Sequence, residues 1–507
     1  MAGALIWTSL CVTFVILAFN TAWTFQTKQP NIVFVLTDDQ DVVLFGQQPM
    51  PKTHKLLTEQ GILFKNMFVS SPLCCPSRAS ILSGQFVHNH NTHNNSALGG
   101  CSGPAWQNQV EPKAFVTYLK AEGYRTFFAG KYLNQYGFKR TGGVEHVPPG
   151  WDEWHGLVGN SVYYNYSLSV NGVEEKHGNN YTEDYLTDVI HHRGLEFLSQ
   201  QSERHPFFMM LSTPSCHAPF TPAPQYEKEF QNEKAPRTKS FNVHGKDKHW
   251  LVEAAATPMA DDVINLVDNN YRQRHRTLLS VDDMVEGVYN KLKAMDLLDN
   301  TYIFFSSDNG FHLGQFSLPN DKRQPYEFDI RVPLIVRGPG IKPNTTSEES
   351  VTNVDLAPTF VDLSGSKGQP HQFDGMSFAR ILHSETHQFR STVLVEYYGE
   401  EADKVPECPQ FNGQHLEGCY KRFHCICQDS KNNTYGCIRY DNSKESFKFC
   451  EFQDTANTIE VYDLKADPDE LTNIAKTAPP QLLSKLTDKL AKLSLCKGKG
   501  CHDNTDL

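Results

Sequence analysis

The sequence predicts an α/β fold in which helices sandwich a large, mostly parallel sheet, followed by a smaller C-terminal α+β domain. Residues 31–36 (NIVFVL) form a continuous apolar run, as in a strand that is buried on both faces. Similar runs alternate with helix-like segments up to about residue 380, which is typical of a parallel sheet covered by helices. From residues 383–390 onward the composition changes and cysteines become frequent.

The expected elements follow one another along the 507 residues. After the first strand we expect a helix at 52–60, a strand at 62–69, a helix at 114–122 and a strand at 124–129. One helical face gathers six apolar residues, namely Val281, Met284, Val285, Val288, Leu292 and Met295. Further strands are expected at 206–212, 301–306 and 332–336, then at 392–398 and 459–464 in the C-terminal domain, with a helix at 480–493.

The N-terminus is predicted to be a signal peptide, residues 1–22. No charged residue precedes Lys28, residues 2–19 are almost wholly apolar, and Asn20-Thr21-Ala22 offers a small-residue cleavage site. An uncleaved membrane anchor is the alternative, because the run approaches a spanning length. No later segment is long and apolar enough to span. The main domain is then predicted at 23–385 and the Cys-rich domain at 386–507.

Composition and charge exclude several classes of protein. Glycine, proline and aromatic contents are ordinary for a globular enzyme, which excludes collagen, a coiled coil and wholesale disorder. The formal net charge is −11 and no Lys/Arg-rich run occurs, so we expect no nucleic-acid partner. An anionic ligand would need cations gathered at its site, because the overall field repels it.

The 13 cysteines indicate an oxidising compartment and disulfides. Zinc is the alternative, but Cys425-x-Cys427 lacks the usual spacing of a zinc knuckle. Eight of them lie beyond residue 400, at Cys408, Cys419, Cys425, Cys427, Cys437, Cys450, Cys496 and Cys501. Glycosylation sequons occur at Asn94, Asn165, Asn180, Asn344 and Asn432.

Two acidic motifs each follow directly on a predicted strand. Residues 37–41 (TDDQD) follow the first strand and residues 307–310 (SDNG) follow another. Parallel strands bring their carboxyl ends to one edge of the sheet, so the two motifs are expected to meet there. Clustered carboxylates repel one another and need a cation, and oxygen ligands favour Ca²⁺ or Mg²⁺ over zinc. The alternative is helix capping by aspartate and a turn at Asn-Gly.

Residues 73–84 (LCCPSRASILSG) form the most informative stretch. Pro76 suits a first helical turn and Gly84 a C-cap, so Cys74 and Cys75 are expected at a helix N-terminus. Unpaired N–H groups there favour anions, and Arg78 adds a cation able to grip an oxyanion. The alternative is a vicinal cysteine pair in disulfides before an ordinary helix. A thiol-phosphatase motif is excluded, because it needs five residues between Cys and Arg, and here three or two lie between them.

The motif Cys74-x-Pro76-Ser77-Arg78-x-x-x-Leu82-Ser83-Gly84 resembles the signature of the sulfatase family. The resemblance implies an alkaline-phosphatase-like fold, with residues 23–385 as the catalytic domain. It also implies that a formylglycine-generating enzyme converts Cys74, not Cys75, to formylglycine during maturation. One Ca²⁺ would then be held by Asp38, Asp39, Asp308, Asn309 and the modified Cys74.

Other short motifs carry the same resemblance. Lys131 in Gly130-Lys131 and Lys322 in Lys322-x-x-x-Tyr326-Glu327 resemble the family's sulfate-binding cations. His217 in Cys216-His217-Ala218-Pro219 resembles its active-site histidine. The implied catalytic residues are therefore Cys74, Arg78, Lys131, His217 and Lys322. Asp467-Pro468-x-Glu470-x-x-Asn473 matches a C-terminal turn of the family. One position departs from it: Leu133 stands where many sulfatases have a histidine, and Asn134 is the candidate replacement.

Within the family, the resemblance is closest to the branch that acts on the 6-sulfate of N-acetylglucosamine in heparan sulfate and keratan sulfate, and to the extracellular heparan endosulfatases. The shared runs are 130–134, 247–250, 279–283 and 308–312. Endosulfatases carry a long basic insertion that this chain lacks, so we expect a lysosomal exo-acting enzyme with a sulfated glycosaminoglycan as substrate. An extracellular endosulfatase, a phosphatase or phosphonate hydrolase, and a catalytically dead glycan-binding protein are the alternatives, and a homodimer is left open.

Four residues are candidates for contact with the sugar: His312, Asn134, His249 and Trp250. A structural hydrogen bond is the alternative for His312, and core packing is the alternative for Trp250. His88, His90 and His93 resemble a metal cluster in spacing, but their polar, Asn-rich surroundings favour ordinary loop residues.

Overall fold

A computed structural model of the protein describes residues 28–366, 370–383, 389–400, 428–442, 444–502, 505 and 507. The predicted signal peptide and the predicted boundary between residues 385 and 386 lie outside this part of the chain, as do Cys408, Cys419, Cys425 and Cys427. The signal peptide and the domain boundary therefore remain predictions. No helix in the described part is long and apolar enough to cross a membrane.

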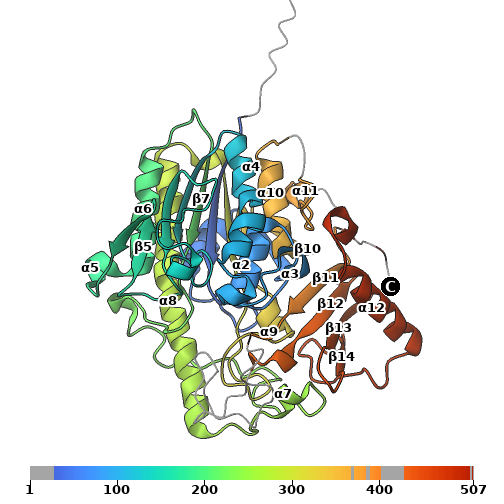
Figure 1. Ribbon diagram of the computed structural model, residues 1–507. Coiled ribbons are helices and arrows are strands. Elements are labelled where there is room, and N and C mark those ends of the chain that lie inside the picture. Colours follow the sequence, from blue (N-terminus) through green and yellow to red (C-terminus); the bar gives the residue numbers. More distant parts are fainter. Residues whose placement is uncertain are drawn as a thin grey trace, which may run out of the picture.

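A ten-stranded sheet forms the centre of the main domain (Figure 1). Its strand order is β10-β2-β9-β8-β1-β7-β3-β4-β5-β6. The five strands from β8 to β4 in this order are mutually parallel, and antiparallel pairs flank them on both sides. The strands are β1 (Asn31–Thr37), β2 (Ile62–Phe68), β3 (Arg125–Gly130), β4 (Glu153–Leu157), β5 (Ser167–Val170), β6 (Val173–Lys176), β7 (Phe207–Ser212), β8 (Thr301–Ser307), β9 (Leu334–Arg337) and β10 (Thr345–Thr352).

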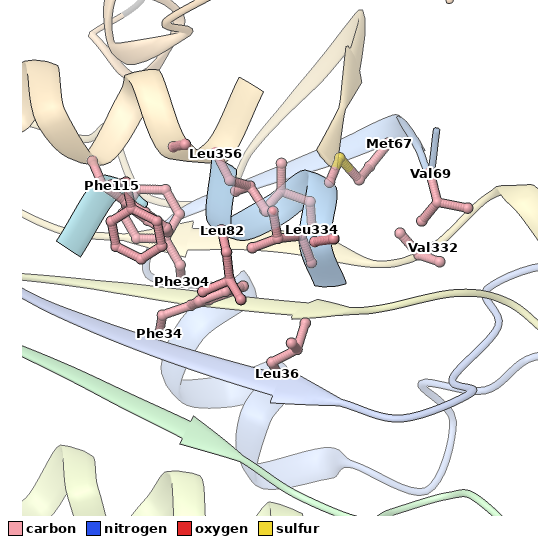
Figure 2. Close-up of a cluster of buried hydrophobic side chains, with 14 of the residues drawn as sticks. Phe34, Leu36, Met67, Val69, Leu82, Phe115, Phe304, Val332, Leu334 and Leu356 are labelled. Atoms are coloured by element: carbon pink, nitrogen blue, oxygen red, sulfur yellow. The ribbon is translucent and has the colours of Figure 1, made fainter. Parts of the chain in front are cut away.

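Helices cover both faces of this sheet, as the apolar runs predict. Alternate residues of β1 point to opposite faces: Phe34 lies in one core cluster and Val35 in the other. The first cluster is closed by α2 (Cys74–Ser83), α4 (Phe115–Ala121) and α10 (Leu356–Leu363), as Figure 2 shows for Leu82, Phe115 and Leu356. The second is closed by α6 (Leu186–Ser199) and α8 (Asp261–Ala294). The shorter helices are α1 (Pro51–Thr53), α3 (Val87–His90), α5 (Tyr181–Asp184), α7 (Trp250–Glu253), α9 (Glu327–Ile330) and α11 (Ala379–Leu382).

The smaller C-terminal domain is built on a four-stranded antiparallel sheet. Its strands are β11 (Thr392–Tyr397), β12 (Tyr435–Asp441), β13 (Ser446–Phe452) and β14 (Ile459–Asp463), in that spatial order. Ile438 and Phe449 on one face pack against Leu486 and Leu490 of α12 (Pro480–Leu493). Val393 and Val395 on the other face join the core of the main domain. The predicted fold class is therefore confirmed, with the two domains sharing one apolar core.

Sequence patterning missed six strands: the edge strands β6 and β10, the inner strands β4 and β5, and β12 and β13 of the small sheet. β6 has the sequence VEEK and is largely exposed, and β10 (TTSEESVT) is polar as well. Neither needs an apolar run, because a strand at the edge of a sheet is not buried on both faces. β12 and β13 lie in the Cys-rich region and are joined by the disulfide Cys437–Cys450; a second disulfide, Cys496–Cys501, follows α12.

Candidate active site

The two acidic motifs meet at the carboxyl ends of β1 and β8. Thr37 pairs with Ser307, so the residues that follow, Asp38 and Asp308, lie side by side. The backbone N–H of Asp39 donates to Asp308 Oδ1 at 3.0 Å. Carboxylate oxygens of these three aspartates lie within 4.8 Å of one another. The structure thus brings together the carboxylates that the sequence predicts at one edge of the sheet.

Three cations surround this cluster, one for each carboxylate. Lys131 Nζ donates to Asp38 Oδ2 at 2.7 Å, and Lys322 Nζ donates to both oxygens of Asp39 at 2.6 and 2.8 Å. Arg78 Nε donates to Asp308 Oδ2 at 2.7 Å. All of these side chains are buried. The described site is therefore balanced in charge before any ion or ligand is added.

Gly130 explains how Lys131 reaches Asp38. Its φ is +110°, and a Cβ there would lie 1.8 Å from the carbonyl oxygen of Ser212 on the neighbouring strand β7. Only glycine fits this approach. The N–H of Lys131 then donates to the same carbonyl at 2.9 Å, which fixes the lysine backbone at the end of β3.

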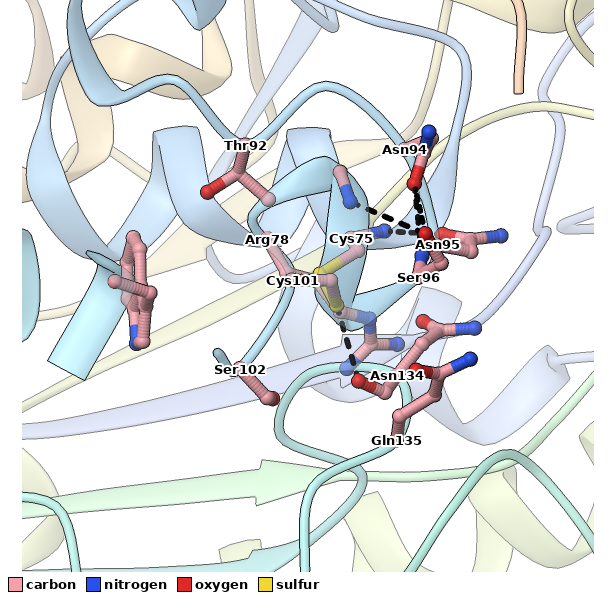
Figure 3. Close-up of a disulfide and its surroundings, with 12 residues drawn as sticks. Cys75, Arg78, Thr92, Asn94, Asn95, Ser96, Cys101, Ser102, Asn134 and Gln135 are labelled. Atoms are coloured by element: carbon pink, nitrogen blue, oxygen red, sulfur yellow. Dashed lines mark hydrogen bonds between the residues drawn. A yellow bond between two sulfur atoms is a disulfide. The ribbon is translucent and has the colours of Figure 1, made fainter. Parts of the chain in front are cut away.

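Cys74 is the first residue of α2, and its thiol faces the cluster. Its Sγ lies 3.7 Å from Asp38 Oδ1, and the side chain is buried. Cys75 instead forms a disulfide with Cys101 (Figure 3). Of the vicinal pair, only Cys74 is therefore a free thiol. Gly84 ends the helix in the left-handed conformation, as predicted for a C-cap.

His217 and Ser161 complete the cluster. His217 Nε2 lies 4.0 Å from Asp39 Oδ2, and its Nδ1 lies 2.6 Å from the carbonyl oxygen of Ala218. Ser161 Oγ donates a short hydrogen bond to Asp38 Oδ2. Ser161 was missed by the sequence analysis because no motif surrounds it. Its only signal is its position, a few residues beyond the carboxyl end of the parallel strand β4.

Burial and neighbouring charges move the pKa values of the site in opposite directions. Burial raises the pKa of Asp38, but Lys131 and His217 beside it hold the pKa well below its usual range. Burial and the charge of Asp38 raise the pKa of Asp308 to about 7, despite Arg78. Burial raises the pKa of the Cys74 thiol to about 12 and lowers that of His217. An unmodified Cys74 thiol is therefore a poor nucleophile at neutral pH.

The donor set of the cluster fits a hard divalent cation. Asn309 Nδ2 donates to Asp39 Oδ1 at 2.7 Å, which leaves the buried Asn309 Oδ1 with no hydrogen-bond partner beside three carboxylates. Oxygen donors of this kind suit Ca²⁺ or Mg²⁺. Arg78 Nη2 is also buried without a hydrogen-bond partner, at 3.7 Å from Asp38 Oδ1. Because the charges already balance, a bound divalent ion would give the site a net charge of about +2, which favours an anionic ligand.

The four candidate sugar contacts lie in different surroundings. His312 is buried between Asp329, 2.9 Å from Nδ1, and Gln428, 3.1 Å from Nε2. His249 and Trp250 share Asp454 of the C-terminal domain and do not contact the carboxylate cluster. Their role in sugar binding remains a prediction.

Asn134 lies nearer to the carboxylate cluster. Its Nδ2 donates to Asn160 at 3.2 Å, next to Ser161, and its buried Oδ1 has no partner. Leu133, where many sulfatases have a histidine, is fully buried among apolar side chains. Asn134 therefore remains the candidate for the missing polar group.

The three histidines of the remaining motif, at 88, 90 and 93, make structural contacts. His88 Nδ1 lies 2.9 Å from Glu396, and His90 Nε2 lies 3.0 Å from Ser80 Oγ, while His93 stacks on Tyr398. In the described part of the chain, the groups of side chains that could hold a metal all lie at the carboxylate cluster. Among the sequons, Asn165, Asn180 and Asn344 are exposed, and Asn94 and Asn432 are half-buried.

Fold and site together define a class: a hydrolase-like α/β scaffold whose strand ends gather oxygen ligands, cations and a helix-terminal cysteine. The sequence profile of the family described as Sulfatase matches residues 30–366. The chain is 52% identical over 479 residues to human N-acetylglucosamine-6-sulfatase, covering 94% of this chain and 86% of that protein. An extracellular sulfatase homologue of Drosophila melanogaster is 42% identical over 394 residues, covering 75% of this chain and 34% of that protein. The chain belongs to the sulfatase family.

Solved structures confirm the alkaline-phosphatase-like fold. One, described as a complex with its substrate D-glucosamine-2-N,6-O-disulfate, has a TM-score of 0.74 at 24% identity, covering 94% of this chain and 99% of that chain. Another is a phosphonate monoester hydrolase from Silicibacter pomeroyi, with a TM-score of 0.67 at 19% identity, covering 92% of this chain and 94% of that chain. Because both share the scaffold, the fold alone does not select the reaction.

Proposed function

We propose that this sulfatase removes the 6-sulfate of N-acetylglucosamine during degradation of heparan sulfate and keratan sulfate. The observation that carries the proposal is the free thiol of Cys74, held 3.7 Å from Asp38 among three cations, while its neighbour Cys75 is in a disulfide. The 52% identity to human N-acetylglucosamine-6-sulfatase over nearly the whole chain supports the substrate.

We propose formylglycine and one Ca²⁺ as the groups that this site requires. The family motif places the conversion at Cys74, and a formylglycine-generating enzyme would act on it before folding, because the folded side chain is buried. Oxidised residue 74 would supply, as an aldehyde hydrate, the hydroxyl that attacks sulfur and the one that later releases sulfate. Asp38, Asp39, Asp308 and Asn309 would hold the Ca²⁺, whose charge would polarise a sulfate oxygen.

The three cations would stabilise negative charge on the transferring sulfate. Arg78, Lys131 and Lys322 are buried and held by carboxylates, so they need little reorganisation when charge develops. Arg78 Nη2 also makes no hydrogen bond, although it lies 3.7 Å from Asp38 Oδ1, and this leaves one donor for a sulfate oxygen.

His217 suits a general acid that protonates the leaving sugar oxygen. The carbonyl of Ala218 can only accept, so Nδ1, 2.6 Å away, carries a hydrogen. The proton that His217 gains or gives is therefore on Nε2, which faces the cluster. Burial lowers the pKa of His217, so the protonated form is favoured by acidic conditions. This agrees with an enzyme working near the pH of lysosomes.

We propose the secretory pathway, and the lysosome in particular, as the location. Three disulfides in the described residues and three exposed sequons support an oxidising compartment. The extracellular space is the second candidate, because two extracellular relatives share 41% and 42% identity with this chain.

Sulfate release by the purified protein with Ca²⁺ at about pH 5 tests the proposal. One oligosaccharide carries the 6-sulfate on its terminal N-acetylglucosamine, and the matched one carries it only on internal residues. We expect release from the terminal substrate alone. Release from internal residues would identify an endosulfatase. If neither releases sulfate, a mass spectrum of the Cys74 peptide decides: an aldehyde means a different substrate, and a thiol supports a dead glycan-binding protein.

A further inference from the structure

Three sequence motifs that the catalytic site does not use converge where the two domains meet. They are the turn at 467–473, the run at 247–250 and the segment that follows Lys322. This segment, residues 323–327, joins the active-site lysine to the first residue of α9. Side chains of the C-terminal domain hold it at both ends.

The first end is held through the backbone of Arg323, the residue after Lys322. Its carbonyl oxygen accepts a hydrogen bond from Tyr435 Oη at 3.0 Å and another from Asn433 Nδ2 at 3.3 Å. Tyr435 begins β12 and is buried. The C-terminal sheet thus contacts the chain one residue from Lys322.

The second end is held at Glu327, the first residue of α9. Its N–H donates to Glu470 Oε2 at 2.9 Å, and its carboxylate accepts from Lys448 at 3.0 Å and Arg439 at 3.2 Å. Lys448 also donates to Glu470 Oε1 at 2.6 Å. Burial raises the pKa of Glu327, but Lys448 and Arg439 outweigh it and hold the pKa well below its usual range.

Tyr326 extends the same arrangement to β14. Tyr326 and Tyr462 both donate to Glu460, at 3.0 and 2.7 Å. Lys248 donates to Tyr462 Oη at 2.8 Å and to the carbonyl of Glu470 at 2.6 Å. We call this set the junction network; it consists of Lys248, Tyr326, Glu327, Arg439, Lys448, Glu460, Tyr462 and Glu470.

We propose that the C-terminal domain is part of the catalytic apparatus, because Tyr435 and the junction network fix residues 323–327 and so position Lys322 Nζ. The inference rests on the proposed role of Lys322 as a sulfate-binding cation. A lysine side chain is flexible, so its place in the site depends on where its backbone is held. Displacements of about 1 Å at a reacting centre can cost about a hundredfold in rate. Tyr435 and Glu470 are therefore positioning residues.

Tyr435→Phe tests the inference because it removes one hydroxyl and keeps the ring. Tyr440→Phe is the matched control: Tyr440 lies on the same strand and is buried, and its hydroxyl accepts hydrogen bonds from Asn442 Nδ2 and from the backbone N–H of Leu507. We expect kcat/KM to fall about tenfold in Tyr435→Phe and to change less than twofold in Tyr440→Phe. Similar losses of kcat/KM in both variants would overturn the inference.

A double-mutant cycle with Lys322→Ala separates positioning from general destabilisation. If Tyr435 acts through Lys322, adding Tyr435→Phe to Lys322→Ala costs no further kcat/KM. Full additivity of the two losses would contradict the proposal. Glu470→Gln, which keeps the shape of the side chain, should show the same dependence on Lys322.

A binding measurement with inorganic sulfate tests the positioning role of Tyr435 without relying on the proposed substrate. Calorimetric titration of the Ca²⁺-loaded protein needs no turnover, so it is readable even if the 6-sulfated oligosaccharide is not hydrolysed. We expect sulfate to bind several-fold more weakly to Tyr435→Phe than to wild type and Tyr440→Phe. Equal sulfate affinities in all three proteins would refute the positioning role. Failure of oligosaccharide hydrolysis with this pattern intact would refute only the proposed substrate.

Discussion

The protein contains two buried clusters of acids and bases that differ in how completely they are satisfied. At the strand ends, three aspartates face three cations, yet Arg78 Nη2 and Asn309 Oδ1 have no hydrogen-bond partner. In the junction network, within the residues the structure describes, no buried side-chain nitrogen or oxygen lacks a partner. Buried polar groups are normally paired, so unpaired ones mark a place prepared for an ion or ligand.

One carboxylate in each region, Asp308 and Glu327, shows the same contrast in its pKa. Burial and Asp38 raise the pKa of Asp308 to about 7, so this carboxylate gains from an added cation. Glu327 is also buried, but Lys448 and Arg439 lower its pKa. A network whose polar groups are all hydrogen-bonded holds the chain in place, whereas a network with unpaired groups can bind an ion or a ligand. Charge pairing alone would not distinguish these two regions.

The largest expected effects come from substituting the vicinal cysteines, Cys74 and Cys75. One substitution should affect activity and the other should affect stability. Cys74→Ala should lower sulfate release by about a thousandfold or more, because it removes the residue proposed to supply the nucleophile, and leave the unfolding free energy nearly unchanged. Cys75→Ala should lower the unfolding free energy by about 2–4 kcal/mol, since it breaks the bond to Cys101. Steady-state assays and chemical denaturation measure the two effects. Activity in Cys74→Ala would contradict the assignment.

Lys448→Met tests whether the junction network is structural. The substitution removes the cation that contacts two buried carboxylates, those of Glu327 and Glu470. We expect the unfolding free energy to fall by about 3–5 kcal/mol, measured by urea denaturation. Lys322→Met at the active site removes the partner of only one carboxylate, so it is the matched comparison. A larger loss of stability at Lys322 would reverse the contrast between the regions.

Removal of the metal should affect the active site and spare the junction network. Chelation should abolish sulfate release and lower the unfolding free energy, by about 3 kcal/mol relative to protein at a hundredfold excess of Ca²⁺ over its Kd. In Asp308→Asn the stabilisation by Ca²⁺ should shrink, and in Glu470→Gln it should persist. Differential scanning calorimetry with and without Ca²⁺ or Mg²⁺ also identifies the preferred ion. Equal stabilisation of all three proteins would exclude the cluster as the metal site.

Asp308 at the strand ends and Glu327 in the junction network should respond to pH with opposite signs in metal-free protein, which is the smallest of these effects. The folded pKa of Asp308 is raised, so its contribution to stability is present below about pH 4 and is lost as pH rises toward 7. The folded pKa of Glu327 is lowered, so its contribution is present above about pH 4.5 and is lost on acidification.

Urea denaturation between pH 4 and 8 measures this difference. Asp308→Asn should reduce the decline in unfolding free energy that raised carboxyl pKa values cause as pH rises between about 4 and 7. An unchanged decline in Asp308→Asn would show that another group is responsible.

The sequence by itself determined four of the five strands of the parallel core, all but β4, and most of the site. Buried strands must be apolar on both faces, so β1, β7 and β8 were visible as continuous runs, and the motifs at their ends located Asp38, Asp39, Asp308 and Asn309. The spacing around Cys74 and Arg78 identified the family. These features are local, because each is encoded within about ten consecutive residues.

Tertiary structure decided what depends on contacts between distant segments. It paired Cys75 with Cys101, brought Ser161 to Asp38, and placed His249 and Trp250 at Asp454 of the C-terminal domain. It also joined the turn at Glu470 to Glu327, more than a hundred residues away. A polar residue in a loop has no periodic pattern, so its partner is known only when the chain is folded around it.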